Sequence, residues 1–252
     1  MKLFKRVLII VGAISLLVLL CGCHEKKSQD IWVVGTSATY PPYEFIDSQG
    51  KVVGFDVDLA QALSRKLGKT LEVQEFAFDA LILNLKQHRI DAILAGMSIT
   101  QDRLKEIHMI PYEGEELREL TLVSKNKHPH KDLSKYSSVA VQTGTFHEEF
   151  LRTLPGVRIR SFDTALEVMM EVRYNKSPVA IFEPTVARLA LKEFPEMHPT
   201  VYPLPESFWV LGNGIGIAKD RPEHKEEVLK ALQEIRESGE LAKLQRAWGL
   251  QP

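Results

Sequence analysis

The sequence has few cysteines, no excess of charge of either sign and no apolar segment long enough to span a membrane. Cys21 and Cys23 are the two cysteines in 252 residues, so the stability must come from hydrophobic cores. The 32 basic and 33 acidic residues leave a net charge of −1, without the basic stripe that is typical of nucleic-acid binding. The longest apolar run, Val7 to Leu20, falls short of the roughly 20 residues that a spanning helix needs.

This apolar run instead has the features of an export signal. Lys2, Lys5 and Arg6 precede it, as in the charged start of a secretory signal peptide. Its end, Leu20-Cys21-Gly22-Cys23, resembles the bacterial lipobox, which implies cleavage before Cys23 and lipidation of that cysteine. Ordinary secretory cleavage near the same point is the alternative.

The expected organisation is therefore a lipoprotein signal peptide over 1–22, a polar tether over 23–30 and a globular remainder. Removal of the signal would take three positive charges and change the net charge from −1 to −4. It would also leave Cys23 without a disulfide partner. The mature length suffices for one large domain or for two lobes of ordinary size. We expect the protein to be exported and held at a bacterial membrane by its lipid.

Strand-like and helix-like segments alternate along the chain. Strands are predicted at 31–34, 71–76, 90–95, 117–123, 139–142, 157–161, 179–182 and 212–218. Helices are predicted at 56–67, 79–88, 145–154, 163–172, 222–238 and 241–248. A hairpin is predicted over 45–53, through a turn at 47–50. Such alternation indicates an α/β protein with parallel sheets covered on both faces.

Three helix starts have recognisable caps. Asp56 is expected to be an N-cap, and Thr145 with Glu148 has the spacing of a capping box. Thr100 is expected to cap a helix whose first turn contains Arg103. A cation there opposes the helix dipole, which is reasonable if Arg103 faces a bound anion. The alternative is a solvated Arg103 paired with Glu106.

Six motifs resemble one known family. They are Gly35-Thr-Ser-Ala-Thr-Tyr-Pro-Pro-Tyr-Glu-Phe45, Gly54-Phe-Asp-Val-Asp-Leu59, Phe78-Asp-Ala-Leu-Ile82, Ile90-Asp-Ala-Ile-Leu-Ala-Gly-Met-Ser-Ile-Thr100, Val141-Gln-Thr-Gly-Thr145 and the closing Gly239-Glu-Leu-Ala-Lys-Leu with Trp248-Gly. Together they resemble the extracytoplasmic solute-binding proteins of polar amino-acid ABC transporters (solute-binding family 3). The resemblance runs from about Ile31 to Gly249.

The resemblance implies a type II periplasmic-binding-protein fold, with two α/β lobes joined by two hinge strands. Lobe 1 would comprise 31–116 and 213–252, and lobe 2 would comprise 117–212. One amino acid would bind in the cleft between the closing lobes. No Walker motif is present, so transport energy would come from separate permease and ATPase subunits. We expect a monomer and no bound nucleic acid.

An α-amino acid requires an anion site and a cation site. Arg103, the Ser98 hydroxyl and the helix terminus at Gly144 and Thr145 would hold the carboxylate, although the Thr145 hydroxyl could serve only to cap its helix. Glu183 ends a buried strand and would hold the α-ammonium, helped by the Gly96 carbonyl. Relatives usually have Asp at the position of Glu183. Met97, in the same motif as Gly96, is also expected in the site.

The ligand side chain would lie between Tyr40 and Phe78, where relatives stack two rings. These rings favour a guanidinium through cation–π attraction. Ser37, where several binders of basic amino acids have Asp, and Glu44 would assist. Arg103 is the sole cation in these segments, which argues against an acidic ligand. L-Arginine is therefore the first choice among basic amino acids.

Three other functions stay open from the sequence, one of which is a receptor that signals to a membrane kinase and feeds no transporter. Glutamine could replace arginine as the ligand of the same kind of receptor. A dehydratase built on the same fold, with Glu183 as its general acid, is an alternative that the motifs favour less. His128 and His130 lack acidic or cysteine neighbours suited to zinc, so neither a metal nor another cofactor is expected.

Overall fold

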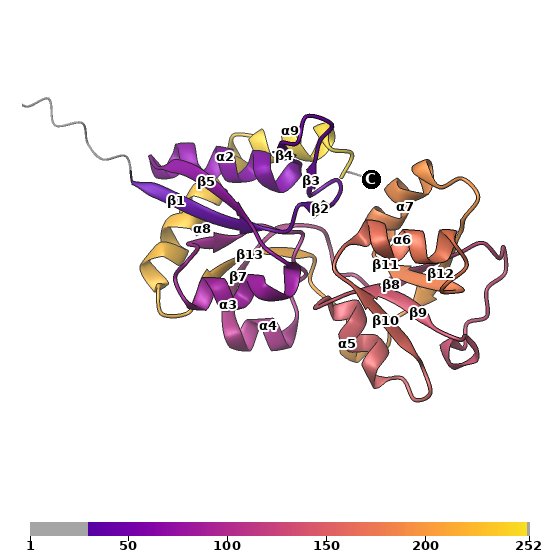
Figure 1. Ribbon diagram of the computed structural model, residues 1–252. Helices are drawn as coiled ribbons and strands as arrows, with labels where there is room; N and C mark the ends of the chain where they lie inside the picture. The colour runs from indigo at the N-terminus through magenta and orange to yellow at the C-terminus, as the bar shows by residue number, and fades with distance from the viewer. Residues whose placement is uncertain (1–29, 251–252) are drawn as a thin grey trace, which may run out of the picture. The chain divides into compact units, whose positions relative to one another are not determined.

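The computed structural model describes residues 30–250, and two five-stranded sheets form its framework (Figure 1). The first sheet has the order β5 (Thr70–Glu75), β1 (Ile31–Thr36), β6 (Ala92–Ile93), β13 (Asn213–Ala218), β7 (Ile107–Glu113). The second sheet has the order β10 (Ile159–Phe162), β9 (Val139–Gln142), β11 (Val179–Phe182), β8 (Glu119–Ser124), β12 (His198–Pro203). A small third sheet contains β2 (Thr39–Tyr40), β3 (Glu44–Ile46) and β4 (Val52–Val53), which includes the predicted hairpin.

Helices cover both faces of the first sheet. They are α2 (Phe55–Leu67), α3 (Leu81–Lys86), α4 (Gln101–Glu106), α8 (Pro222–Glu237) and α9 (Glu240–Ala247). Side chains alternate along β1, so Trp32 and Val34 belong to the hydrophobic core that contains α2 and α8. Val33 instead packs with Leu81 of α3 in a separate core. Covered faces were expected from the alternating pattern.

The second sheet is also covered on both faces. Its helices are α5 (Phe146–Thr153), α6 (Ala165–Arg173) and α7 (Pro184–Glu193), with short turns at η2 (Leu133–Lys135) and η3 (Glu206–Phe208). A third short turn, η1 (Phe78–Ala80), precedes α3 beside the first sheet. Phe150 of α5 packs with Val139 and Val141 of β9 in one core. Val168 of α6 belongs to a different core with Ala140.

Two segments connect the sheets and run side by side. The chain leaves the first sheet after β7, and it returns to β13 after β12. An antiparallel bridge joins Leu117 to Val210, and the Leu117 N–H donates to the Val210 carbonyl at 2.8 Å. The two connecting segments are therefore hydrogen-bonded to each other where they cross between the sheets.

The sheets are mixed, which corrects the prediction of parallel sheets. β1 is parallel to β5 and β6, but β13 is antiparallel to both β6 and β7. In the second sheet, β8 is antiparallel to β11 and β12. β7 and β12 were not predicted, and neither was α7. Antiparallel neighbours need no crossover helix, so the strand–helix alternation could not reveal the strands β7 and β12.

One predicted helix cap is wrong, and one predicted capping box is only half formed. The cap of α2 is Gly54, and Asp56 lies inside the first turn, where its carboxylate accepts the Gly96 N–H at 2.7 Å. Gly54 has φ 139°, and a Cβ there would lie 2.1 Å from the Tyr43 carbonyl oxygen. Thr145 does cap α5, but the Glu148 carboxylate bonds to Gly144 rather than to Thr145. The capping box is therefore incomplete.

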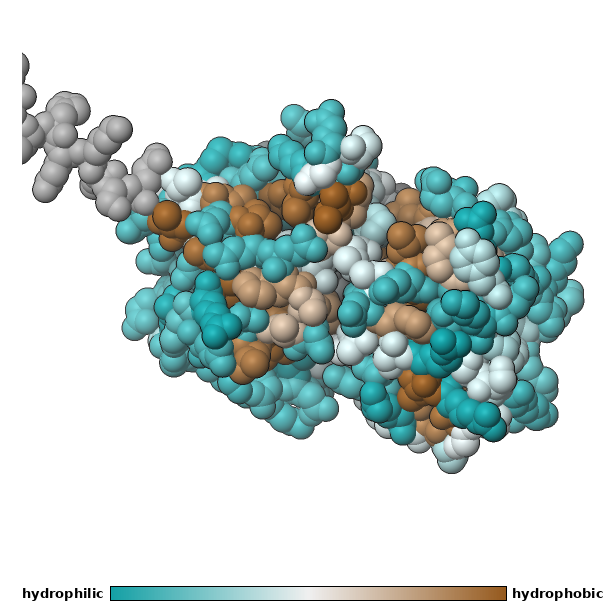
Figure 2. Space-filling model, in the orientation of Figure 1, coloured by the Kyte–Doolittle hydropathy of each residue, from teal (hydrophilic) through white to brown (hydrophobic). Residues whose placement is uncertain are grey.

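The view in Figure 2 shows a mainly hydrophilic surface with separate hydrophobic patches. Between residues 30 and 250, no helix is long and apolar enough to cross a membrane. The predicted signal peptide and Cys23 lie outside these described residues.

Candidate functional site

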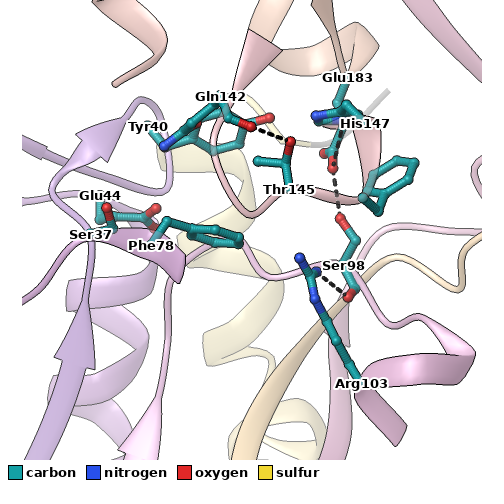
Figure 3. A pocket seen from close by; sticks show the side chains of 12 residues that line it. Ser37, Tyr40, Glu44, Phe78, Ser98, Arg103, Gln142, Thr145, His147 and Glu183 are labelled. Atoms are coloured by element: carbon teal, nitrogen blue, oxygen red, sulfur yellow. Dashed lines mark hydrogen bonds and ion pairs between the residues drawn. The ribbon is translucent and has the colours of Figure 1, made fainter. Parts of the chain in front are cut away.

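A pocket of about 290 Å³ lies where strands of both sheets end (Figure 3). Apart from Glu44, which begins β3, its lining residues follow or end strands, or lie at the start of the helices after them. The lining comprises Ser37, Tyr40, Glu44, Phe78, Gly96, Ser98, Arg103, Gln142, Thr145, Phe146, His147 and Glu183. Ligands collect at the carboxyl ends of strands in α/β sheets, because loops and helix N-termini converge there.

Arg103 is the cation of this pocket. Thr100 caps α4 as predicted, accepting the Arg103 N–H at 3.2 Å, and this places the side chain towards the pocket. The guanidinium donates to the Ser98 carbonyl at 2.8 Å and to the Gly144 carbonyl at 3.1 Å. Arg103 is 5% exposed, and Glu106 pairs with Lys86 instead. The structure therefore rejects the solvated Arg103–Glu106 pair.

Burial lowers the pKa of the Arg103 guanidinium, but an arginine side chain stays charged in a protein. The bonds to the Ser98 and Gly144 carbonyls use two of its five N–H donors. The planar guanidinium therefore has further N–H donors that can bind a carboxylate through two parallel hydrogen bonds.

Glu183 reaches the pocket from the second sheet and contacts Ser98, the residue whose carbonyl accepts Arg103. The residue follows β11 and is 8% exposed, and its Oε1 accepts the Ser98 hydroxyl at 2.7 Å. Burial raises the pKa of the Glu183 carboxyl to about 7, against the opposing effects of the Ser98 bond and the Arg103 charge. The Ser98 proton is thus engaged by Glu183, which differs from the prediction that this hydroxyl holds a ligand carboxylate.

Glu44 is the second carboxyl of the pocket. It is fully buried, and no N–H or hydroxyl donor among the described residues reaches either carboxyl oxygen. Burial raises the pKa of Glu44 well above its usual value, and the charge of Asp56 and a side-chain hydrogen bond to its carboxyl raise it further. A buried carboxyl with no other donor can still receive a donor or a cation from a ligand.

Asp56 lies behind the pocket rather than in its wall. Its carboxylate accepts the Tyr112 hydroxyl at 2.7 and 2.8 Å as well as the Gly96 N–H. Burial raises the pKa of Asp56 to about 7, although these hydrogen bonds oppose the shift. Asp56 therefore fixes the Gly96 backbone that borders the pocket.

Two rings lie on the side of the pocket near Glu44. The Tyr40 ring is stacked on Tyr43, with centroids 6.2 Å apart. The Phe78 centroid lies 5.3 Å from Cζ of Arg103, so one cation–π contact is made within the protein. As drawn in Figure 3, Phe78 lies between Glu44 on one side and Ser98 on the other.

Gly144 supports the site from beside the pocket. Its carbonyl accepts Arg103, and its N–H donates to Glu148 at 2.9 Å. The Thr145 hydroxyl donates to the Gln142 carbonyl at 2.7 Å and accepts from Glu148 N at 3.4 Å. That hydroxyl therefore caps its own helix, which was the alternative raised from the sequence.

The structure brings most of the predicted site residues together. Of the ten predicted, all except Met97 and Gly144 line the pocket. The Met97 side chain lies in the core beneath α3, because residues alternate between the two sides of an extended segment. Gly144 acts through its backbone.

The sequence reasoning missed Gln142, Phe146 and His147 in the lining. Gln142 was inside a quoted motif but was not selected. Phe146 and His147 follow the Gly-Thr loop on the first turn of α5, a position that could have indicated them.

Comparison with known proteins places the chain in a family. Residues 32–251 match the sequence model of the bacterial extracellular solute-binding proteins, family 3. The chain therefore belongs to this family, whose members work outside the cytoplasm. Its fold is the two-lobed type II fold of periplasmic amino-acid-binding proteins, and we refer below to the sheets and their helices as lobes.

Individual relatives agree. The chain is 58% identical to the "Probable ABC transporter arginine-binding protein ArtJ" of Chlamydia trachomatis, over 92% of this chain and 91% of that protein. A Salmonella typhimurium periplasmic binding protein described as highly specific for arginine is 27% identical, with a TM-score of 0.80 over 87% of this chain and 99% of that one. An ancestral arginine-binding protein bound to glutamine is 30% identical, with a TM-score of 0.77 over 87% and 98%. These relatives are solute-binding proteins rather than enzymes, which argues against the dehydratase alternative.

Proposed function

We propose that this protein is the arginine-binding receptor of an ABC importer. Arginine has two cationic groups and one carboxylate, whereas the pocket lining has one cation, Arg103, and two carboxyls, Glu44 and Glu183. The charged groups of the pocket are thus opposite in sign and equal in number to those of arginine, and this observation is the main support for the proposal. An acidic amino acid would bring a second negative charge to Glu44 and would find no second cation.

In this proposal each group of the ligand has its own partner. Arg103 holds the α-carboxylate, with the helix terminus after Gly144. Glu183 and the Gly96 carbonyl hold the α-ammonium. The guanidinium lies near Glu44 and Ser37, against the rings of Tyr40 and Phe78, where flat cations gain stacking and cation–π attraction.

We further propose the lobe boundaries expected from the sequence, 31–116 with 213–252 and 117–212. Ligand bridging the lobes would shift the population of states towards the closed form, which would dock on the permease. The lipid on Cys23 would keep this monomeric receptor at the membrane surface.

A thermal-shift scan tests the ligand. The full-length protein, purified in detergent, is unfolded in guanidinium chloride and refolded to remove any bound amino acid, and is then heated with each of the twenty amino acids, ornithine and citrulline. A ligand of the folded state at 100 times its Kd stabilises it by about 2.7 kcal/mol. We expect the largest shift with arginine, smaller shifts with lysine and ornithine, and none with glutamate.

Other outcomes would change the proposal in defined ways. A shift with glutamine alone would keep the receptor and replace its ligand, an alternative that a protonated Glu44 could accommodate by hydrogen bonding to an amide. No shift with any of these compounds would reject amino-acid binding.

Gly144→Ala should weaken arginine binding at least tenfold. Gly144 has φ 72°, and a Cβ there would lie 2.6 Å from the Asp79 Cβ across the cleft. The added methyl group would separate the lobes next to Arg103 and lengthen its bond to the Gly144 carbonyl. Isothermal titration calorimetry measures the change.

Gly50→Ala is the matched control, because Gly50 has a similar φ of 77° but nothing within 4 Å of a built Cβ. Both variants therefore carry the backbone strain of a left-handed alanine, roughly 1–2 kcal/mol. Equal arginine affinity in the two variants would show that the close approach of Gly144 to Asp79 is not required for binding.

A further inference from the structure

His147 is a buried titratable residue of the pocket that the proposed contacts leave unused. It lies in the first turn of α5, is 3% exposed and packs on Phe146 with ring centroids 4.2 Å apart. Its Nε2 atom is buried, and no hydrogen-bond partner for it occurs among residues 30–250. Figure 3 shows the imidazole beside Glu183. An orphaned buried polar atom in a ligand pocket indicates a partner that comes with the ligand.

The imidazole of His147 is neutral. Burial and the positive charge of Arg103 lower its pKa to about 3. The ring therefore stays uncharged from pH 5 to pH 8, and in the tautomer that carries its proton on Nδ1 the Nε2 atom is an acceptor. Its separation from Glu183 is consistent with this state: Nε2 lies 3.7 Å from Oε1, which is too long for a hydrogen bond.

The surroundings of Nε2 favour a cationic donor. Glu183 lies beside it, the Ser98 hydroxyl already donates to Glu183, and Arg103 is the charged neighbour from α4. Two acceptors 3.7 Å apart can both lie within hydrogen-bond distance of one nitrogen atom. An ammonium group has three donors and no acceptor, so it can satisfy both at once. A carboxylate at this point would be repelled by an ionised Glu183.

We propose that His147 is a ligand-contacting residue, whose Nε2 accepts a hydrogen bond from the α-ammonium group of the bound amino acid beside Glu183. This inference rests on the proposed function, since it assumes an α-amino acid in the pocket. With Glu183 and the Gly96 carbonyl, His147 would supply a third acceptor for the three ammonium donors. Specificity for a free α-amino group would then depend on both lobe-2 side chains, His147 and Glu183.

A ligand comparison tests the role of His147. Calorimetry measures L-arginine and 5-guanidinopentanoic acid, which is arginine without its α-amino group, on the full-length wild-type protein and on His147→Phe. The weaker ligand is measured by displacement of arginine at millimolar concentration. We expect His147→Phe to weaken arginine about 5- to 150-fold, the range for leaving one buried polar group unpaired, and to leave the deamino compound unchanged.

A second variant separates this role from a packing role. His147→Gln keeps a side-chain acceptor and should lose less arginine affinity than His147→Phe, with both melting temperatures recorded. Equal losses for both ligands in both variants, or no loss for either ligand, would overturn the proposal. If arginine fails to bind the wild-type protein, the proposed function fails instead, and the two failures are thereby distinguished.

Discussion

Replacement of Arg103 by alanine is expected to weaken the binding of every amino acid by at least about 30-fold. Arg103 is the one cation in the pocket lining, and its guanidinium is held in place by the Ser98 and Gly144 carbonyls. Removal of one partner of a buried, hydrogen-bonded charge pair costs about 2–5 kcal/mol, because the other charge is left buried and unpaired. That cost corresponds to a loss between about 30-fold and several thousandfold. Calorimetry with arginine, lysine and glutamine should show a similar loss of affinity for all three ligands.

Arg103→Lys distinguishes charge from geometry. Lysine keeps the positive charge but lacks the planar fork, so we expect an intermediate affinity with the order of ligands unchanged. Arg173→Ala is the control: Arg173 also lies over a ring, 5.4 Å from the Phe194 centroid, but it pairs with Glu196 away from the pocket. Wild-type affinity in Arg103→Ala would reject the assignment of the carboxylate site.

The parts of the site that were predicted follow from local rules. Thr100 is a strong N-cap, so the sequence alone places Arg103 on the first turn of α4. Glu183 directly follows a run of four buried residues, and the end of a buried strand in an α/β sheet borders the ligand crevice. Both predictions require only the position of a residue within one element.

The parts that were missed depend on contacts between distant segments. Asp56 has the sequence of a cap, but its partners Gly96 and Tyr112 lie some forty and fifty-six positions further along the chain. The antiparallel positions of β7 and β13 likewise depend on how the chain returns to the first sheet. Capping propensity is worth only about 1 kcal/mol, so a buried hydrogen-bond network can outweigh it.

Glu148 shows the same limit at shorter range. Its spacing from Thr145 predicts a capping box, yet its carboxylate accepts Gly144 N–H, the Ser161 hydroxyl and Arg152. Ser161 belongs to β10, the strand beside β9. A neighbour in the sheet thus redirects the side chain, and the same carboxylate then fixes the loop whose carbonyl accepts Arg103.

Glu44→Gln is expected to lower arginine affinity at least 30-fold and to reduce the preference for arginine over glutamine. The guanidinium of bound arginine would place its charge against Glu44, whose carboxyl oxygens receive no N–H or hydroxyl donor within the described part of the chain. An amide of the same shape can accept a hydrogen bond but cannot neutralise a cation, so the loss should be that of a buried charge pair, about 2–5 kcal/mol. Binding of glutamine requires no countercharge and should change little.

The fold should tolerate this replacement, which makes the measurement decisive. Burial and the charge of Asp56 raise the pKa of Glu44 and favour its neutral form, which glutamine imitates. Glu75→Gln, which changes an exposed carboxylate at the end of β5, controls for the loss of one negative charge. Calorimetry with arginine and glutamine on the three proteins gives the ratio of affinities directly. A preference for arginine that survives in Glu44→Gln would mean that the rings of Tyr40 and Phe78, rather than a buried countercharge, select the guanidinium.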